Sequence, residues 1–489
     1  MTRTFNTRIV IKTLGALLLI ESAFMVLPTV VSWLYHEADT AVFCLSTLIT
    51  FLFGAVGVLI GRNAEKHVAE REGYLIVAIV WVVFSFFGLL PFYLSGAIPS
   101  YTDAFFETIS GFTTTGATIL NDIERLSHGC LLWRSLTQWL GGMGIIVLSL
   151  AILPMFGLGG MQLYAAEVTG VSYEKLSPRI ADTAKRLWAL YLLLTIIEAL
   201  LLWAFKMDLF DAVNHSLTTI ATGGYSTKNL SIAYYDSAAI QYTISFFMLI
   251  SGINFALLYY LILFKPSRLL KDEETHWYLG AVAVVTLVLS IGLFVHSTVW
   301  SFSSAERSFR TALFTTIATM TSTGFSVDNY MLWKPFLWVI VFFLMFTGAS
   351  SGSTSGGVKW VRIAIFAKNG IAEFKRRIHP NAIVPAKING KAITQQTIGN
   401  VMAFMMFYIL IIVVSTLIFC ALGVDFDESI GATVSAIGNI GPAIGQFGPA
   451  GTFASFPTLG KWWMAFVMLV GRLEIFTVLL LFSPALWRK

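Results

Sequence analysis

Charged residues are scarce in this chain of 489 residues. Asp, Glu, Lys and Arg make up 12% of it, whereas soluble proteins carry about 25%. Apolar residues make up 56%, and the mean hydropathy is +0.76. This balance excludes a protein that is globular in water and predicts an all-α integral membrane protein. The net charge of +5 gives no reason to expect a nucleic-acid partner.

Residues that carry enzyme or metal chemistry are also few. The three cysteines, Cys44, Cys130 and Cys420, are scattered without a CxxC pair, as small buried side chains are. The seven histidines show no metal-ligand spacing, and no GxSxG nucleophile turn is present. A Walker motif and a GxGxxG strand–helix unit are both missing. A membrane enzyme is therefore the least favoured class, and the chain itself is expected to bind no organic cofactor.

Long apolar segments dominate the sequence instead. A spanning helix needs roughly 20 apolar residues, and about ten candidate transmembrane helices meet that length. They lie at residues 11–33, 40–61, 75–97, 131–157, 187–205, 239–264, 277–298, 334–366, 397–422 and 461–486. Basic residues gather in alternate loops and at both ends of the chain. The positive-inside rule then predicts a multi-pass protein of a lipid bilayer with both termini in the cytoplasm.

Four short stretches of the chain resemble one another, and each joins a short amphipathic helix to a glycine-bearing turn. They are Asp103–Thr118, Asp211–Ser226, Thr311–Ser326 and Glu428–Ala443, with anchor glycines Gly116, Gly224, Gly324 and Gly441 spaced 108, 100 and 117 residues apart. A helix of about ten residues is too short to cross the bilayer. Non-helical backbone is tolerated at membrane depth only where protein or water surrounds it. The pattern predicts a central pore built from four quarters of one polypeptide.

Each quarter is expected to contain a helix, a pore helix, a turn and a second helix, in four pseudo-symmetric repeats. The predicted segments are two extra N-terminal helices at 1–70 and the quarters 71–160, 161–270, 271–390 and 391–489. Asp103, Asp211 and Glu428 stand near the starts of pore helices. Carboxylates there can cap the helices or concentrate cations at the mouth of the pore.

The turns are predicted to form a selectivity filter. Rings of backbone carbonyls replace the hydration shell of a potassium ion in potassium channels, and glycine permits the backbone angles that this requires. The predicted potassium-binding residues are Thr114, Thr115, Gly116, Thr222, Gly223, Gly224, Ser322, Thr323, Gly324, Asn439, Ile440 and Gly441; Thr113, Ala221, Thr321 and Gly438 lie one step deeper. Ordinary loop chemistry explains any single turn equally well, but four turns in register favour a filter.

A run of small residues interrupts the predicted span 334–366. Residues 348–357 contain four glycines and five hydroxyl residues, and each glycine costs about 1 kcal/mol relative to alanine in a helix. A close-packing site for helices is one interpretation, but ten consecutive small residues favour a mobile gate loop across the pore. The predicted gate residues within it are Gly348, Ser350, Ser351, Gly352, Ser353, Ser355, Gly356 and Gly357.

Arg472 lies among apolar residues of the last predicted span, where an ionisable residue is a functional hypothesis by default. It either faces the pore and repels cations or holds the gate loop through the loop carbonyls. A local pair with Glu474 is the alternative, although residues two apart on a helix point to different faces. Lys359, just after the loop, is predicted to join the gate. Glu21 and Glu198 are also intramembrane, and a structural role is favoured for both.

The four turns resemble those of the Trk/Ktr/HKT superfamily of potassium transporters from about residue 75 onward. The two additional N-terminal spans are similar to those of the TrkH/TrkG type. The resemblance implies that one glycine per quarter forms the filter and that four glycines favour potassium over sodium. Potassium is the expected ion, and rubidium or sodium are the further candidates. The turns depart from the potassium-channel TVGYG pattern at Thr118, Ser226, Ser326 and Ala443, so a shorter carbonyl ladder and less strict selectivity are expected.

The same resemblance implies a bacterial cell inner-membrane location and a homodimer with one pore per protomer. It also implies gating by the loop in the third quarter, with a basic residue of the fourth quarter at Arg472. A cytosolic TrkA-type ring that binds NAD or ATP is the implied partner, and loops 162–187 and 368–391 are candidate docking surfaces. The alternative is a sodium- or proton-coupled secondary transporter. Such folds usually have two inverted repeats, whereas four parallel repeats fit an axial pore better.

Overall fold

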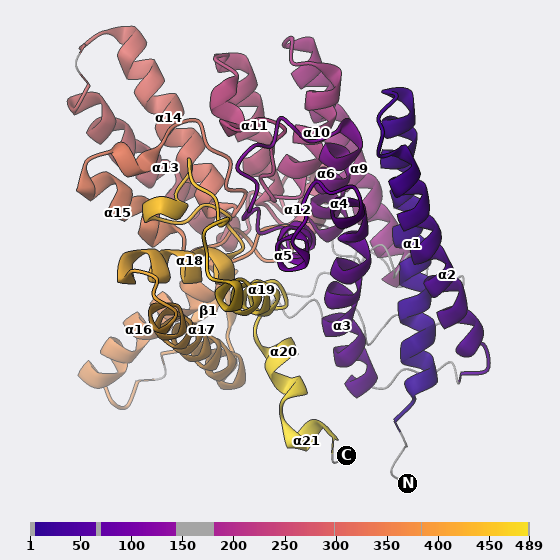
Figure 1. Ribbon diagram of the computed structural model, residues 1–489. Helices are drawn as coiled ribbons and strands as arrows, with labels where there is room; N and C mark the ends of the chain where they lie inside the picture. Colours follow the sequence, from indigo (N-terminus) through magenta and orange to yellow (C-terminus); the bar gives the residue numbers. More distant parts are fainter. Residues whose placement is uncertain (1–4, 65–69, 143–179, 298, 383, 488–489) are drawn as a thin grey trace.

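The computed structural model describes residues 5–64, 70–142, 180–297, 299–382 and 384–487. Within these ranges six helices are long and apolar enough to cross a membrane, and the number is seven if one pair of helices bent by 107° is counted as a single span. The prediction of an all-α membrane protein is confirmed. Figure 1 shows α1 and α2 on one flank of the helical bundle and α13 to α15 on the other, with α5, α18 and α19 near its middle.

The two N-terminal helices, α1 (Thr7–Leu34) and α2 (Thr40–Ile60), form a tightly packed antiparallel pair. Glycines permit the close approach, because a Cβ atom added at Gly15 would lie 2.7 Å from the carbonyl oxygen of Gly54. Small residues at a crossing let membrane helices pack backbone to backbone. Glu21, on α1, is fully buried.

The first quarter holds the first of the short pore helices. Its described elements are α3 (Glu70–Gly88), α4 (Leu90–Leu94), α5 (Tyr101–Phe112) and α6 (His128–Gly142). The hydroxyl of Ser100, rather than the carboxylate of Asp103, caps α5 by accepting from the Asp103 N–H. The rest of the predicted span 131–157 lies outside the described residues, as do the predicted boundary at 160 and 161 and most of loop 162–187.

The second quarter repeats this order and adds a sharp bend. Its elements are α9 (Ile180–Ala204), α10 (Leu209–Ile220), the 3₁₀ turn η2 (Ser231–Tyr234), α11 (Ala238–Ser251) and α12 (Phe255–Ile262). Asp208 caps α10 by accepting from the N–H of Phe210 at 2.9 Å. The predicted span 239–264 is a helix pair bent by 107° between α11 and α12.

The third quarter contains the run of small residues. Its elements are α13 (Glu273–Val295), α14 (Phe302–Met320), the 3₁₀ turn η3 (Tyr330–Leu332), α15 (Pro335–Leu344) and α16 (Trp360–Ile378). The predicted span 334–366 is therefore two helices separated by non-helical backbone. Its second helix, α16, continues to Ile378 and carries Lys375, Arg376 and Arg377 in its last turn.

The fourth quarter opens with a small hairpin. Its elements are β1 (Lys387–Ile388), β2 (Lys391–Ala392), α17 (Gln395–Ala421), α18 (Phe426–Gly438), the 3₁₀ turn η4 (Gly445–Phe447), α19 (Thr458–Arg472), α20 (Phe476–Leu481) and α21 (Pro484–Trp487). Asn389 and Gly390 turn the hairpin with φ of 49° and 75°, as an Asn-Gly hairpin turn requires. The predicted span 461–486 is interrupted after α19, where Glu474 and Ile475 have φ of 56° and 61°.

Candidate ion filter and gate loop

The four glycine-bearing turns have the same backbone conformation. The first residue of each predicted trio has φ between 52° and 54°, and the anchor glycine that ends it has φ between 75° and 98°. The residues concerned are Thr114 and Gly116, Thr222 and Gly224, Ser322 and Gly324, and Asn439 and Gly441. Positive φ is uncommon outside glycine, so its recurrence at four equivalent non-glycine positions marks a specific structure rather than ordinary loops.

Each turn is bonded to the end of its own pore helix. The N–H of the middle residue of each trio donates to the carbonyl six residues before the anchor glycine. These bonds are Thr115 to Ser110 at 2.8 Å, Gly223 to Thr218 at 2.9 Å, Thr323 to Ala318 at 2.9 Å and Ile440 to Ser435 at 3.0 Å. The C-terminal end of a helix carries partial negative charge, so four helix ends beside the turns favour a cation there.

The four anchor glycines close a ring. A Cβ atom added at each would lie too close to a carbonyl oxygen of the next quarter. The distances from the added Cβ atom to the carbonyl oxygen are 2.2 Å for Gly116 and Gly223, 1.7 Å for Gly224 and Thr323, 1.9 Å for Gly324 and Ile440, and 2.8 Å for Gly441 and Thr115. The contact order runs through all four quarters and returns to the first, so the turns surround one axis. Glycine is required here by both φ and close approach.

A cavity of about 250 Å³ opens over this ring, and all four anchor glycines line it. Among the described residues its wall includes the basic side chains of Arg134 and Lys228 but no carboxylate. The nearby acids are paired instead: Asp103 with Lys461 at 2.6 Å and Asp211 with Lys228 at 3.1 Å. These two carboxylates neither cap their helices nor line the cavity.

Asp211 shows why such a carboxylate stays ionised in a buried position. Thr227 Oγ1 donates to it at 2.6 Å and Tyr235 Oη at 2.7 Å. Burial works to raise the pKa of Asp211, but these hydrogen bonds and Lys228 outweigh it, and the pKa lies below its ordinary value. Burial, followed by the Asp211 carboxylate, raises the pKa of Tyr235. The phenol therefore remains a hydrogen-bond donor.

The side chains that brace the turns differ between quarters. In the first and third quarters two hydroxyls bond each other, Thr113 with Thr115 at 2.8 Å and Thr321 with Thr323 at 2.7 Å. In the second quarter Gln138 of α6 donates to the Gly223 carbonyl at 2.6 Å and accepts from the Tyr225 N–H at 3.0 Å. In the fourth, the Asn439 amide donates to Thr115 Oγ1 and to the Met468 carbonyl, both at 2.9 Å.

Arg134, also on α6, joins the first and second turns. Its Nε donates to Glu107 at 2.7 Å and its Nη1 to the Ser226 carbonyl at 3.0 Å. The guanidinium carbon lies 3.5 Å from the ring centroid of Tyr225. Neither Arg134 nor Gln138 is among the residues predicted from the sequence. The rule that singled out Arg472, a polar side chain within an apolar span, applies equally to them.

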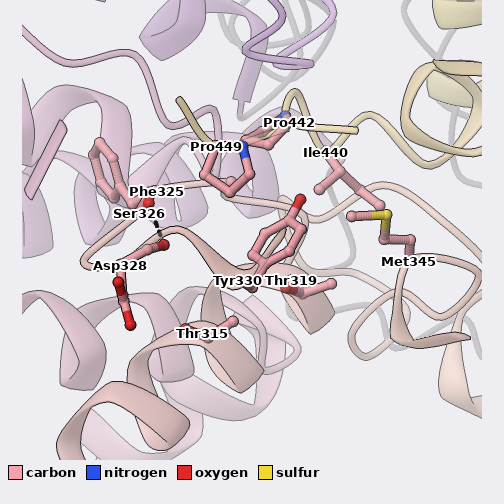
Figure 2. A pocket seen from close by; sticks show the side chains of 11 residues that line it. Thr315, Thr319, Phe325, Ser326, Asp328, Tyr330, Met345, Ile440, Pro442 and Pro449 are labelled. Carbon is pink, nitrogen blue, oxygen red and sulfur yellow. Dashed lines mark hydrogen bonds between the residues drawn. The ribbon is translucent and has the colours of Figure 1, made fainter. Parts of the chain in front are cut away.

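The third and fourth turns meet around Tyr330. Its hydroxyl donates to the Ala443 carbonyl at 2.6 Å. Figure 2 shows its ring between Thr319 and the prolines Pro442 and Pro449. The cavity that these residues line, next to Gly324 and Ile440, is only about 10 Å³, which is room for at most about one water. The ring of anchor glycines is therefore closely packed where the third and fourth turns meet.

The small-residue run, which we call the gate loop (residues 348–357), contacts the opposite side of the turns from the cavity. Thr354 Oγ1 donates to the carbonyl of Ile220, the last residue of α10, at 3.1 Å. The Gly356 N–H donates to Ser322 Oγ at 2.7 Å. A Cβ atom at Gly356 would lie 2.4 Å from the carbonyl oxygen of Gly438, the last residue of α18. The loop thus touches three quarters beneath the ring.

The remaining predicted gate residues hold the loop's own shape and its contact with the bend between α11 and α12. Ser350 donates its N–H to the Gly252 carbonyl at 3.0 Å, and Gly352 accepts from the Phe255 N–H at 3.0 Å. Close backbone approach, internal bonds and left-handed glycines complete the fold of the loop. The backbone of Gly348 lies close to that of Gly356. Ser353 Oγ donates to the Ser350 carbonyl, and the Ala349 N–H donates to Ser355 Oγ. Gly352 and Gly357 have φ of 73° and 66°.

Arg472 donates to carbonyl oxygens of the gate loop and of α6. Its Nη1 donates to Thr354 at 2.7 Å, and its Nη2 donates to Gly141 at 2.6 Å and Gly142 at 2.8 Å. The side chain thereby ties the loop to the end of α6 in the first quarter. Lys359 Nζ donates to the Ser355 carbonyl. Glu474 accepts a hydrogen bond from Arg362 of α16.

Known proteins match this chain over nearly its whole length. The family model of TrkH, described as a cation transport protein, matches residues 40–489. The chain is 39% identical over 485 residues to the Trk system potassium uptake protein TrkH of Escherichia coli K12, covering 99% of each. It is 40% identical over 491 residues to TrkH of Halomonas elongata, covering 99% of this chain and 100% of the relative.

A solved structure shows the same fold. The crystal structure of the potassium transporter TrkH from Vibrio parahaemolyticus matches with a TM-score of 0.89 and 37% sequence identity, covering 99% of this chain and 100% of that one. A family model that matches most of the chain, and relatives at this level of identity, agree with the resemblance inferred from the four turns. The chain is a member of the TrkH family of cation transport proteins, a transporter family and not an enzyme family.

Proposed function

We propose that this protein is the potassium-conducting subunit for uptake across a bacterial cell inner membrane. The observation that carries the proposal is the closed ring of Gly116, Gly224, Gly324 and Gly441, in which four turns that share positive φ at two equivalent positions surround one axis. The names of the relatives, which describe potassium uptake proteins, support the choice of ion.

The ring acts as the filter. The carbonyls of the twelve residues predicted in the turns replace water around a partly dehydrated potassium ion, and the C-terminal ends of four pore helices add negative potential. The Gly223 carbonyl already accepts from Gln138, but a carbonyl oxygen has a second lone pair for the ion. Rubidium passes by the same chemistry, and sodium is disfavoured because the braced ring does not contract around it.

The gate loop closes the path beneath the filter. Its contacts with Ile220, Ser322 and Gly438 lie under three of the four quarters, and Arg472 ties it to the first. Opening requires the loop to leave this position. Arg472 and Lys359 contribute positive charge next to the closed loop, which further disfavours a cation there.

The proposed membrane orientation and partner subunits are those that the family resemblance implies. The start of α1 and the helix α21 lie at the same end of the molecule in Figure 1, which supports two cytoplasmic termini. The basic last turn of α16 follows the positive-inside rule for that side. A homodimer and a cytosolic TrkA-type nucleotide-binding ring complete the proposed assembly, with the loop 368–391 as a docking surface.

One observation favours a second candidate, a sodium- or proton-coupled transporter. Broken helices at membrane depth are typical of such transporters, and α11 and α12 bend by 107°. Coupled transport requires that a sodium or proton gradient drive potassium accumulation. Potassium flux that follows only the potassium gradient would exclude this candidate.

The test of the proposed function is ion flux into proteoliposomes that contain the purified chain. We expect potassium and rubidium to enter faster than sodium, and Gly224→Ala to reduce that preference more than tenfold, because its Cβ would lie 1.7 Å from the Thr323 carbonyl oxygen. Gly441→Ala, at 2.8 Å from Thr115, should have a smaller effect. Gly96 has φ of 73° but no atom within 4 Å of a Cβ, so Gly96→Ala isolates backbone strain. An unchanged preference in Gly224→Ala would refute the filter.

A further inference from the structure

A buried carboxylate, separate from Arg472, also bonds the gate loop. Glu274 lies in the first turn of α13 and is only 4% exposed. Its Oε1 accepts from the N–H of Ser351 at 2.6 Å and from the N–H of Val361 at 3.1 Å, while Oε2 accepts from Ser351 Oγ at 2.8 Å. One side chain thus joins the first half of the loop to the start of α16, the helix that follows it.

This arrangement fixes the loop relative to α16. Because a single oxygen accepts from both N–H groups, the carboxylate sets the separation of Ser351 from Val361. A loop that moves away from the pore as a unit, while α16 stays in place, must break at least one of these bonds. A buried N–H without a partner is strongly unfavourable. The contact therefore favours the conformation seen here.

The backbone that carries Glu274 is itself held by the hairpin of β1 and β2. Asn389 at its turn accepts from the Glu273 N–H at 2.7 Å, donates its amide to Asp272 Oδ1 at 3.1 Å and donates its N–H to Glu273 Oε2 at 3.0 Å. Lys368 of α16 bonds both the Glu273 carboxylate and the Lys387 carbonyl. The start of α13, the hairpin and α16 thereby form one bonded unit around the carboxylate.

We propose that Glu274 is a positioning residue that latches the gate loop in its closed position. Arg472 holds the loop through Thr354, and Glu274 holds it through Ser351. The latch rests on the proposed function, in which the loop gates the pore. It adds a second point of control, on α13, that is separate from the filter and from the fourth quarter.

Rubidium flux into proteoliposomes tests the latch, with Glu274→Ala, Glu274→Gln and Glu373→Ala compared with the native chain. We expect Glu274→Ala to raise flux about tenfold, because it leaves the closed loop with unpaired N–H groups, and the potassium-to-sodium ratio to stay unchanged. Glu274→Gln should raise flux less, since its amide oxygen still accepts from both. Glu373 pairs only with Arg376 and Arg377 among the described residues, so its variant should match the native chain.

Native flux in a folded Glu274→Ala protein would overturn the latch. A lower potassium-to-sodium ratio would also overturn it, because the residue would then be supporting the filter. If Glu274→Ala does not fold, Glu274→Gln and Ser351→Ala are measured against the native chain instead, because each removes only part of the contact. Native flux in both of these variants refutes the proposal. Absence of potassium flux in the native chain, or an unchanged preference in Gly224→Ala, would instead refute the proposed function.

Discussion

The filter turns and the gate loop are both glycine-rich, non-helical segments at the centre of one molecule, yet the backbone of each turn is also bonded to its own pore helix, in addition to its side-chain braces. Each turn is bonded to the helix that precedes it, as Thr115 is to Ser110 and Thr323 is to Ala318. Apart from its internal bonds and its backbone bonds to the bend between α11 and α12, the loop is held by side chains that are distant in sequence. Arg472 lies 118 positions from Thr354, and Glu274 lies 77 positions from Ser351.

This difference indicates which segment moves. A local backbone bond persists unless the helix that supplies it unfolds. A side-chain contact between distant elements is lost when either element shifts slightly, at the cost of one or two hydrogen bonds. We therefore expect the four turns to be the fixed part of the proposed ion path and the loop to be its movable part, in which a few contacts separate two positions.

Arg472→Ala should break the loop side of this comparison with the largest effect. The substitution removes the donors to Thr354, Gly141 and Gly142 together, and bonds from a charged donor are among the stronger ones. We expect rubidium flux to rise by more than about tenfold, with the potassium-to-sodium ratio unchanged.

The matched control is Arg125→Ala, because the side chain of Arg125 is 85% exposed and pairs with Asp122 at the surface. A loss of ion preference in Arg472→Ala, without a rise in flux, would mean that Arg472 supports the filter rather than the loop.

Gln138→Leu should disturb the filter side and leave the loop closed. It leaves the Gly223 carbonyl and the Tyr225 N–H without their partner, at about 1–3 kcal/mol each. We expect a lower melting temperature and a severalfold lower potassium-to-sodium ratio, with no rise in total flux.

Gln241→Leu provides the comparison, since Gln241 is also buried but bonds the Tyr235 carbonyl outside the turns. It should reduce stability alone. An increase of flux in Gln138→Leu would contradict the assignment of the turns as the fixed part.

Ser435→Ala should have the smallest effect and tests how much a single hydroxyl contributes. Ser435 Oγ donates to the Gly441 carbonyl at 2.7 Å, a bond worth about 1 kcal/mol. The third quarter has Ala318 at the equivalent position, so a turn tolerates the loss. We expect less than about a twofold change in ion preference, measured by competition between potassium and sodium. A loss as large as that of Gln138→Leu would show that this hydroxyl orients a carbonyl for the ion.

The features that the sequence predicted are the local ones. A glycine with positive φ at the end of a short helix depends on a few neighbouring residues, so the four anchors were recognisable from their spacing. The break at Gly348–Gly357 was evident from composition. The break at Glu474 and Ile475 was not, because Ile475 is β-branched and adopts φ of 61° against its own preference.

The contacts that hold these segments were beyond the sequence. Gln138 and Gly223 are 85 positions apart, and Arg472 and Gly142 are 330 apart. No periodicity encodes such pairs, because they depend on how whole helices pack. The order in which the four turns follow one another around the axis has the same origin. The roles of the filter and gate residues in ion binding stay predictions until flux is measured.

The closed ring of anchor glycines also has a consequence for heredity. In a ring of four identical subunits, one codon change alters all four equivalent positions at once, so no single position can be adjusted alone. Here each corner has its own codon, and a substitution alters one edge while the other three remain. The quarters have already diverged in this way, with alanine at position 318 where its counterparts at 110, 218 and 435 carry a hydroxyl.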